Sequence, residues 1–178
     1  MKRKKASSAD NQQERSKRQF FRGYVVGLVD GEGSFHVAFP KREDLVLGIS
    51  VIPEFHVSQN YRSIKVLELL KSILGCGYLK ANHPGSKDNT YVFVVRDRND
   101  LLTKIIPYFE VNNLLTTKIN DFKIFATIVR MMDRGLHLNQ KGIIKIIKLA
   151  YQMNEKGNRR KKKLKETIDS LKSSETIR

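Results

Sequence analysis

The sequence predicts a single domain of the α+β class, with the element order α-β-β-α-β-β-α followed by extra C-terminal helices. Two observations predict this order. An apolar segment with a glycine at every fourth position gives way, at Gly33, to strict alternation of apolar and polar residues. After a leucine-rich segment with helical spacing, a second pair of alternating segments flanks a turn-rich stretch at residues 83–89. Such strands are typical of one antiparallel sheet that helices cover on its apolar face.

The first predicted helix covers residues 16–30 and has two different sides. Apolar side chains form one side, and Gly23, Gly27 and Gly31 form the other. Each interior glycine costs a helix roughly 1 kcal/mol relative to alanine, so we expect another segment to pack closely there. The apolar run ends at Asp30, short of the roughly 20 residues that a membrane span needs. The glycine side therefore predicts a contact with another, soluble helix. Because the chain contains no internal repeat, a second helix of the same kind would have to come from a second chain, with Gly23, Gly27 and Gly31 at the dimer interface.

Two carboxylates, Asp30 and Glu32, lie where this helix is predicted to end, just before Gly33. Carboxylates at a helix C-terminus oppose the helix dipole, so a purely structural cap would favour lysine. Carboxylate and backbone carbonyl oxygens gathered at one junction suit a hard divalent cation such as Mg²⁺. The sequence therefore predicts a magnesium site at this junction, with the carboxylates of Asp30 and Glu32 and the carbonyl of Gly31 as candidate ligands.

The alternating segments predict a sheet with one apolar and one polar face. Residues 34–39 form the first strand, residues 40–44 a hairpin turn and residues 45–59 a longer second strand. Residues 78–82 and 90–97 form the second hairpin. A strand of about ten residues extends roughly 33 Å, close to one turn of B-DNA, and a two-stranded ribbon fits the major groove.

The charge of the chain predicts a polyanionic partner for this polar face. The formal net charge is +16, which favours nucleic acid, and we expect double-stranded DNA. The candidate DNA-binding residues are Ser34, His36, Ala38, Arg42, Ser50, Glu54, His56, Lys80, Asn82, Lys87, Thr90 and Arg96.

The remaining apolar stripes predict further helices. These helices cover residues 63–74, 100–109, 117–132 and 139–153, with a weak one at 164–171. The predicted division of the chain is a basic disordered tail at residues 1–15, a folded domain at 16–153 and a basic C-terminal extension at 154–178.

Cysteine and histidine usage excludes several other sites. The lone Cys76 excludes an intramolecular disulfide and a cysteine-based zinc site, and it fits a reducing, intracellular compartment. No apolar run approaches membrane length and no hydrophobic signal core is present, so we expect no membrane association. The histidines that lack the sequence spacing of zinc ligands are His36, His56, His83 and His137.

Residues 25–33 read Val-Val-Gly-Leu-Val-Asp-Gly-Glu-Gly and resemble the nine-residue signature of the LAGLIDADG homing endonucleases, with Glu32 at the second acidic position. Residues 53–59 and the leucine-rich helix after them resemble the single-motif members encoded in group I introns of ribosomal RNA. Residues 117–122 match a later helix of that family. The likeness covers about residues 20–130.

This resemblance implies a saddle-shaped antiparallel sheet and a homodimer that binds a long, pseudo-palindromic DNA site. It implies magnesium-dependent cleavage of both strands with short 3′ overhangs, which promotes intron mobility in a bacterial cytoplasm or an organelle interior. In relatives, the glutamine that matches Gln59 lies in the catalytic pocket, where it would orient the attacking water. Lys118 is the candidate for a basic residue near the scissile phosphate. Asp30 is expected to cap backbone amides at the N-terminus of the partner's motif helix.

Two other functions fit the same scaffold. One is an RNA-binding maturase that assists intron splicing, and the other is a DNA-binding regulator that does not cleave. Both would tolerate loss of the acidic group at the helix end. The presence of Glu32 together with Gln59 therefore favours cleavage.

Overall fold

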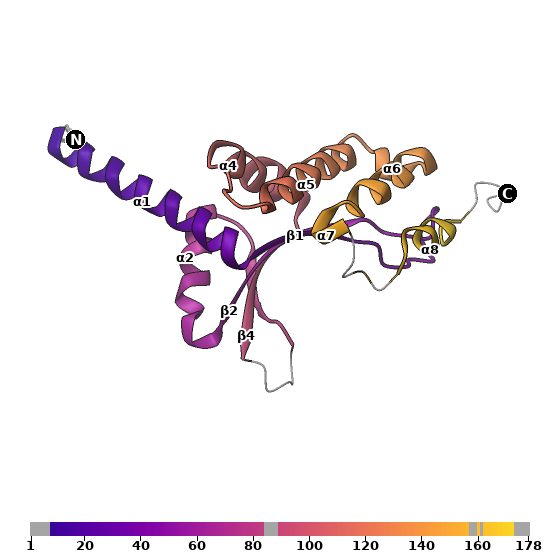
Figure 1. Cartoon of the computed structure of the whole chain (residues 1–178), viewed down its shortest axis with the longest axis horizontal. Helices are drawn as coiled ribbons and strands as arrows, with labels where there is room; N and C mark the ends of the chain where they lie inside the picture. The colour runs from indigo at the N-terminus through magenta and orange to yellow at the C-terminus, as the bar shows by residue number, and fades with distance from the viewer. Residues whose placement is uncertain (1–7, 84–88, 157–159, 161, 173–178) are drawn as a thin grey trace, which may run out of the picture.

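The computed structural model describes residues 8–83, 89–156, 160 and 162–172 (Figure 1). The helices and strands follow the predicted α+β order. In chain order they are α1 (Ser8–Glu32), β1 (Gly33–Ala38), β2 (Ile52–Asn60), η1 (Tyr61–Ser63), α2 (Ile64–Leu74), β3 (Tyr78–Ala81), β4 (Thr90–Val95), α3 (Arg98–Asp100), η2 (Leu101–Ile105), α4 (Ile106–Val111), α5 (Lys118–Asp133), η3 (Leu136–Leu138), α6 (Gln140–Ala150), α7 (Met153–Lys156) and α8 (Leu164–Asp169).

The four strands form one antiparallel sheet in the order β1-β2-β4-β3. The central strand β2 pairs with β1 through Val57 opposite Gly33, and with β4 through Gln59 opposite Tyr91. Helices α4, α5 and α6 lie on one side of the sheet, and the N-terminal half of α1 projects away from the body (Figure 1). The sheet is therefore covered by helices on one face, as the alternation predicted.

Aromatic side chains from the sheet and the helices meet at the centre of the core. Phe35 of β1 stacks on Phe55 of β2 with ring centroids 5.0 Å apart. Phe109 of α4 and Phe122 and Phe125 of α5 contact the ring of Phe35, with centroids 5.3 to 5.8 Å away. All five rings are buried. This packing fixes which face of β1 and β2 points inward, so the alternate side chains lie on the opposite face.

The second strand is shorter than predicted, because residues 45–51 do not form part of it. The predicted hairpin is present, since residues 40–42 pair with residues 48–50 through an antiparallel bridge between Lys41 and Ile49, but its turn lies within residues 43–48 rather than 40–44. Strand β2 begins only at Ile52. Gly48 has φ +72°, a left-handed conformation that an extended strand does not contain. The carbonyl of Leu47 accepts the backbone N–H of Lys172 at 3.2 Å, so the end of α8 takes the place of a strand partner. Leu47 is buried, and the apolar alternation that predicted a strand reflects loop packing.

Helix α1 is longer than predicted at its N-terminus. It begins at Ser8, so residues 8–15, predicted to be disordered, continue the helix. This part is rich in glutamine, glutamate and arginine, which extend an existing helix at low cost, and an ion pair joins Glu14 to Arg18 one turn later. The predicted end at the acidic junction is confirmed, since α1 ends at Glu32. Among the described residues, no helix has both the length and the apolar character for a membrane span.

The predicted helix at residues 100–109 forms as consecutive short pieces. The π-helical turn η2 joins α3 to α4, and Pro107 lies in the first turn of α4 rather than in a final turn. A proline fits there because the first turn has no use for its missing N–H. Gly75 and Gly135 end their helices in left-handed conformations, with φ of 64° and 73°, which confirms both predicted stops.

The C-terminal residues pack back onto the domain. The Arg160 guanidinium donates to the carbonyl of Val37 at 2.9 Å and lies 4.7 Å from the ring centroid of Tyr151. The Tyr151 Oη atom lies 2.6 Å from Oγ1 of Thr167 in α8. Arg160 and α8 therefore pack against the rest of the chain, and the division of the chain at residue 154 stays a prediction.

Candidate functional site

The end of α1 presents Glu32 at the surface. Val25 and Val29 are fully buried and fix the helix against the sheet. A Cβ on Gly33 would lie 2.6 Å from the Val29 carbonyl oxygen, so a side chain would clash at the turn into β1. Glu32 itself is exposed, and its carboxylate makes no hydrogen bond or ion pair with any residue that the structure describes. Both oxygens are free to bind a cation.

Asp30 holds the segment before α5 in its own chain. Its Oδ2 atom accepts the backbone N–H of Leu115 at 2.7 Å, and its Oδ1 atom accepts the hydroxyl of Thr116 at 2.7 Å and the Thr116 N–H at 3.3 Å. Burial raises the pKa of Asp30, but these hydrogen bonds outweigh burial and lower the pKa below its ordinary value. Both oxygens thus accept N–H groups near the start of α5 in the same chain, and the expected cap on the partner's motif helix stays a prediction.

Lys118, the first residue of α5, reaches the same end of α1. Its Nζ atom donates to the carbonyls of Val29 and Asp30 at 2.7 and 2.9 Å. The helix dipole favours a cation at this C-terminus. Burial lowers the pKa of Lys118, against the opposing charges of Asp30 and Glu32. The fold thus brings Lys118 close to the predicted metal ligand, and its contact with phosphate stays a prediction.

A polar cavity of about 690 Å³ opens beside this helix end, with Gly31 and Lys118 in its wall. Asn154, also in the wall, has a positive φ of 50°. Its backbone N–H donates to Asp121 at 2.9 Å, and its side-chain amide donates to the carbonyl of Phe35 at 3.1 Å. Asn154 therefore ties α5 to β1 at the cavity. The sequence did not indicate Asp121 or Asn154 as site residues. Asp121 lies in the family-like stretch 117–122, but the contact between the two residues depends on the tertiary fold.

Gln59 lies at the end of β2, two residues beyond Val57, which pairs with Gly33. Gly33 directly follows the last residue of α1, so this pairing places the end of β2 that contains Gln59 near the end of α1. By alternation it shares the inward face with Phe55, and its side chain is half-buried. This position supports a place at the catalytic helix end, and its role toward water stays a prediction.

His36, Glu54 and His56 form a compact cluster on the opposite face of the sheet. The register creates it, because Ser34 pairs with His56 and His36 pairs with Glu54. The Glu54 Oε2 atom lies 3.0 Å from Nε2 of each histidine, and the two rings are 4.5 Å apart. Arg96 donates to the other Glu54 oxygen. These partners allow the carboxylate to be buried.

Burial and neighbouring charges set the protonation state of each residue in this cluster. Burial lowers the pKa of His36, and burial, followed by the neighbouring His36, lowers the pKa of His56 to about 4. Both imidazoles are therefore neutral at neutral pH. Burial raises the pKa of Glu54, but the hydrogen bond from Arg96 and the nearby histidines outweigh it, so the carboxylate stays ionised. Glu54 is 5% exposed, which corrects its prediction as a direct DNA contact.

Other predicted DNA-binding residues differ in their exposure and in their hydrogen-bond partners. Lys80 of β3 is exposed on the polar face. The Arg42 guanidinium binds both carboxylate oxygens of Asp44, at 2.8 and 2.7 Å, in the exposed loop. The backbone N–H of Asn82 donates to the carbonyl of Thr90 at 2.8 Å, which extends the hairpin of β3 and β4. DNA contact by these residues stays a prediction.

The polar face also contains apolar residues. Val92 and Val94 are buried on it, since Val94 pairs with His56 and Val92 with Ser58. Sequence alternation did not place them there, because all residues from 92 to 95 are apolar. The remaining DNA-binding candidates are Ser34, Ala38 and Ser50, all half-buried, and Lys87, which lies outside the described residues.

Gly23, Gly27 and Gly31 form an open strip along α1. A Cβ at any of these positions would meet no atom of the described chain within 4 Å. A groove of about 700 Å³ follows the strip, and Leu115 in its wall is 87% exposed. Phe20 on the same helix is 66% exposed. Apolar side chains beside a smooth strip are typical of a protein contact surface, and dimerisation stays a prediction.

Known proteins share much of this sequence and fold. The sequence model for the LAGLIDADG endonuclease family matches residues 25–129. Probable intron-encoded endonuclease 2 of Neurospora crassa is 30% identical over 126 residues, which cover 71% of this chain and 26% of that protein, so the chain spans about a quarter of its length. The crystal structure of the homing endonuclease I-TnaI is 39% identical, with a TM-score of 0.75 over 83% of this chain and 95% of its own. The archaeal intron-encoded homing endonuclease I-Vdi141I, complexed with DNA, is 30% identical, with a TM-score of 0.76 over 86% of this chain and 95% of its own.

Proposed function

This chain belongs to the LAGLIDADG endonuclease family, and on that premise we propose that it is a homing endonuclease that acts as a homodimer on double-stranded DNA. The proposed reaction hydrolyses one phosphodiester bond in each strand of a long, pseudo-palindromic site. The observation that carries this proposal is the exposed Glu32 carboxylate, free of partners in the described chain, at the end of a helix with an open glycine strip. The expected consequence is intron mobility, in a bacterial cytoplasm or an organelle interior.

A second copy would complete the site, because one chain supplies a single Glu32. If two α1 helices pack through the strip of Gly23, Gly27 and Gly31, the two carboxylates come together at a twofold axis. The open space at these glycines and the exposed side chain of Leu115 support this packing. The twofold axis would also give the protein the symmetry of its DNA site.

The end of α1 fits a magnesium ion. The Glu32 carboxylate and the Gly31 carbonyl offer hard oxygen ligands, and both residues are exposed. Asp30 is not a candidate, because Leu115 and Thr116 already use its oxygens. A divalent cation held here would supply the positive charge that stabilises negative charge on the reacting phosphate.

Lys118 and Gln59 would act directly on the substrate. An ammonium group has three N–H donors, and Lys118 uses two of them on the carbonyls of Val29 and Asp30. The third remains to bind an oxygen of the scissile phosphate. Gln59, near the same helix end by register, would orient the attacking water.

The polar sheet face would lie along the major groove. Lys80 is exposed there, and Arg96 is half-exposed while it holds Glu54. One sheet covers about 10 base pairs, so two copies would read about 20. The paired Glu32 groups would lie between the half-sites at the central minor groove. Cuts across a minor groove leave short 3′ overhangs, which we expect here.

Cleavage of the intronless target by purified protein with Mg²⁺ tests the proposal. The wild type should cut both strands, and mapping on end-labelled DNA should reveal 3′ extensions; blunt or 5′-extended ends would contradict the dimeric arrangement. Glu32→Gln should bind the same DNA without cutting it. The matched control Glu68→Gln, at an exposed position of α2, should cut like the wild type. Wild-type cleavage by Glu32→Gln would sink the metal assignment, and binding of DNA or intron RNA without any cleavage would favour a regulator or a maturase.

A further inference from the structure

The cluster of His36, Glu54 and His56 has the donors and the spacing of a transition-metal site. One potential ligand atom of each residue lies within 4.8 Å of those of the other two. Both imidazole Nε2 atoms lie 3.0 Å from the same carboxylate oxygen. Ligand atoms bound about 2.0 Å from a tetrahedral zinc ion are about 3.3 Å from one another. The two nitrogen–oxygen separations are already close to this value.

A second observation indicates a missing ligand at this place. The Nε2 atom of His56 is buried and has no hydrogen-bond partner among the described residues. Glu54 Oε2 lies 3.0 Å away, but the two groups are not aligned for a hydrogen bond. Buried nitrogens without a partner are uncommon in folded proteins, and a bound metal ion would satisfy this one.

We propose that His36, Glu54 and His56 bind a divalent transition-metal ion, for which Zn²⁺ is the best match. Two imidazoles and one carboxylate form a known zinc donor set, in contrast to the oxygen ligands at Glu32. His36 lies three residues along β1 from Gly33, about 10 Å from the end of α1, so the two sites are separate. The contact of Arg96 with the other oxygen of Glu54 orients the carboxylate toward the two rings.

The ion would have an open position on the nucleic-acid face of the sheet. Three protein ligands leave the fourth tetrahedral position free for water or another donor. The side chains of His36 and His56 are 31% and 23% exposed, so this position opens toward the surface that contains Lys80. The ion would link β1 to β2 and add two positive charges per chain to that face.

Direct metal binding tests this site independently of cleavage. The full-length protein, freed of metal with a chelator, is titrated with Zn²⁺, and in parallel with Co²⁺, whose visible spectrum reports tetrahedral coordination. We expect one tight Zn²⁺ per chain and a tetrahedral Co²⁺ spectrum. His36→Ala and His56→Ala should weaken Zn²⁺ binding by a factor on the order of 100 or more, since loss of mere supporting groups already costs 10- to 100-fold.

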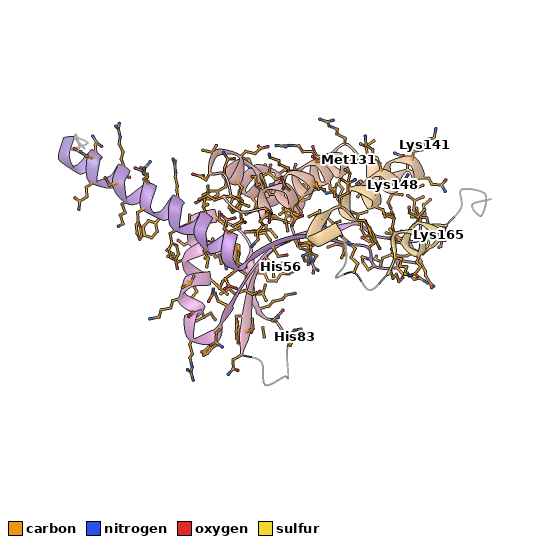
Figure 2. All side chains as sticks on the ribbon, in the orientation of Figure 1. His56, His83, Met131, Lys141, Lys148 and Lys165 are labelled. Atoms are coloured by element: carbon orange, nitrogen blue, oxygen red, sulfur yellow. The ribbon has the colours of Figure 1, made fainter. Side chains whose placement is uncertain are left out.

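Two variants serve as matched controls. His83→Ala removes an exposed histidine near the far end of the β3–β4 hairpin, away from His56 (Figure 2), and should bind Zn²⁺ like the wild type. Glu32→Gln should also bind Zn²⁺ normally, because it changes only the end of α1. Circular dichroism confirms that each variant is folded. A wild type that binds no more Zn²⁺ than folded His36→Ala, or a site that Glu32→Gln abolishes, would overturn the proposal.

Discussion

Glu32 at the end of α1 and Glu54 on the sheet are the same kind of side chain in opposite surroundings. Glu32 is exposed and free of partners in the described chain, whereas Glu54 is 5% exposed and contacts two histidines and Arg96. A buried carboxylate persists only with such partners, because losing water is costly. An exposed one keeps its oxygens for a ligand. The difference teaches that the surroundings decide what each carboxylate can bind: Glu32 offers two oxygens without hydrogen-bond partners, which suits Mg²⁺, whereas Glu54 can bind a cation only together with the two histidines that face it.

The largest contrast is expected when each carboxylate is replaced by an amide. Glu32→Gln should slow single-turnover cleavage by a factor on the order of 10²–10³ or more and leave Tm unchanged. Glu54→Gln should mainly lower the free energy of unfolding, by about 1–3 kcal/mol, since Arg96 loses its charged partner. Because the Arg96 side chain is half-exposed, we expect a loss toward the lower end of this range. Thermal unfolding and cleavage rates measured on both proteins check this. A Glu32→Gln protein that melts far below the wild type would abolish the contrast.

Gly27→Leu should separate association from folding. The open space around Gly27 accommodates a leucine within one chain, so far-UV circular dichroism should remain that of a folded protein. The close approach of a second α1 helix should fail, and sedimentation should show monomers without cleavage activity. Gln13→Leu, at an exposed position of α1 outside the glycine strip, should stay dimeric and active. A Gly27→Leu protein that remains dimeric would contradict the proposed contact through the glycine strip.

The end of α1 could be predicted because its signal is local. Within one segment the glycine spacing, the acidic pair and the change to alternation at Gly33 gave the helix end and the position of Glu32. The cluster on the sheet could not be found in this way. His36 and His56 are far apart in sequence, and only the strand register brings their Nε2 atoms to one Glu54 oxygen. Spacing along the chain, on which the exclusion of zinc rested, carries no information about such a contact.

Prediction of the sheet was correct where the signal was local and wrong where long-range contacts decide the structure. Alternation correctly gave the inward faces of Phe35 and Phe55, since these faces are defined by neighbouring residues. The same alternation wrongly extended β2 through residues 45–51. There the backbone of Leu47 binds Lys172, far along the chain. Local pattern cannot distinguish a strand from a loop whose apolar side chains pack on the same core.

The burial of His56 in the cluster should make the free energy of unfolding depend on pH. Burial lowers the pKa of His56 to about 4 in the folded protein, against an ordinary value of 6.5. Between these two pH values, His56 is protonated in the unfolded chain but neutral in the folded protein. The free energy of unfolding is therefore highest above about pH 6.5 and falls as the pH falls toward 4. We expect a loss of about 1–3 kcal/mol, reduced by the partial exposure of the ring.

Denaturant unfolding between pH 7 and pH 4.5, with a chelator present, measures this loss. His56→Gln should flatten the dependence, because it removes the titrating ring. His83→Gln, whose ring is exposed, should keep the wild-type dependence. Equal slopes for the wild type and His56→Gln would show that burial of this imidazole does not control stability.

The smallest expected effect comes from the C-terminal support of the sheet. The Tyr151 Oη atom lies 2.6 Å from Thr167 Oγ1 and donates a hydrogen bond to the Lys162 carbonyl at 2.9 Å. Tyr108 is the opposite case, since its Oη is buried without a hydrogen-bond partner among the described residues. Tyr151→Phe should lower the free energy of unfolding by about 1 kcal/mol. Tyr108→Phe should leave it unchanged or raise it slightly, because it removes an unsatisfied hydroxyl.

The location of the loss in Tyr151→Phe distinguishes the two regions. Tyr151 fixes α8, and the backbone of Lys172 beyond α8 binds the carbonyl of Leu47 in the loop before β2. Amide hydrogen exchange should therefore accelerate in residues 39–51. The end of α1 depends on Asp30 and Lys118 instead, so its exchange and the single-turnover cleavage rate should remain at wild-type values. If amide exchange at the end of α1 accelerated as much as in residues 39–51, the two regions would form one cooperative unit. Glu32 and Glu54 would then differ in burial but not in the stability of the regions around them.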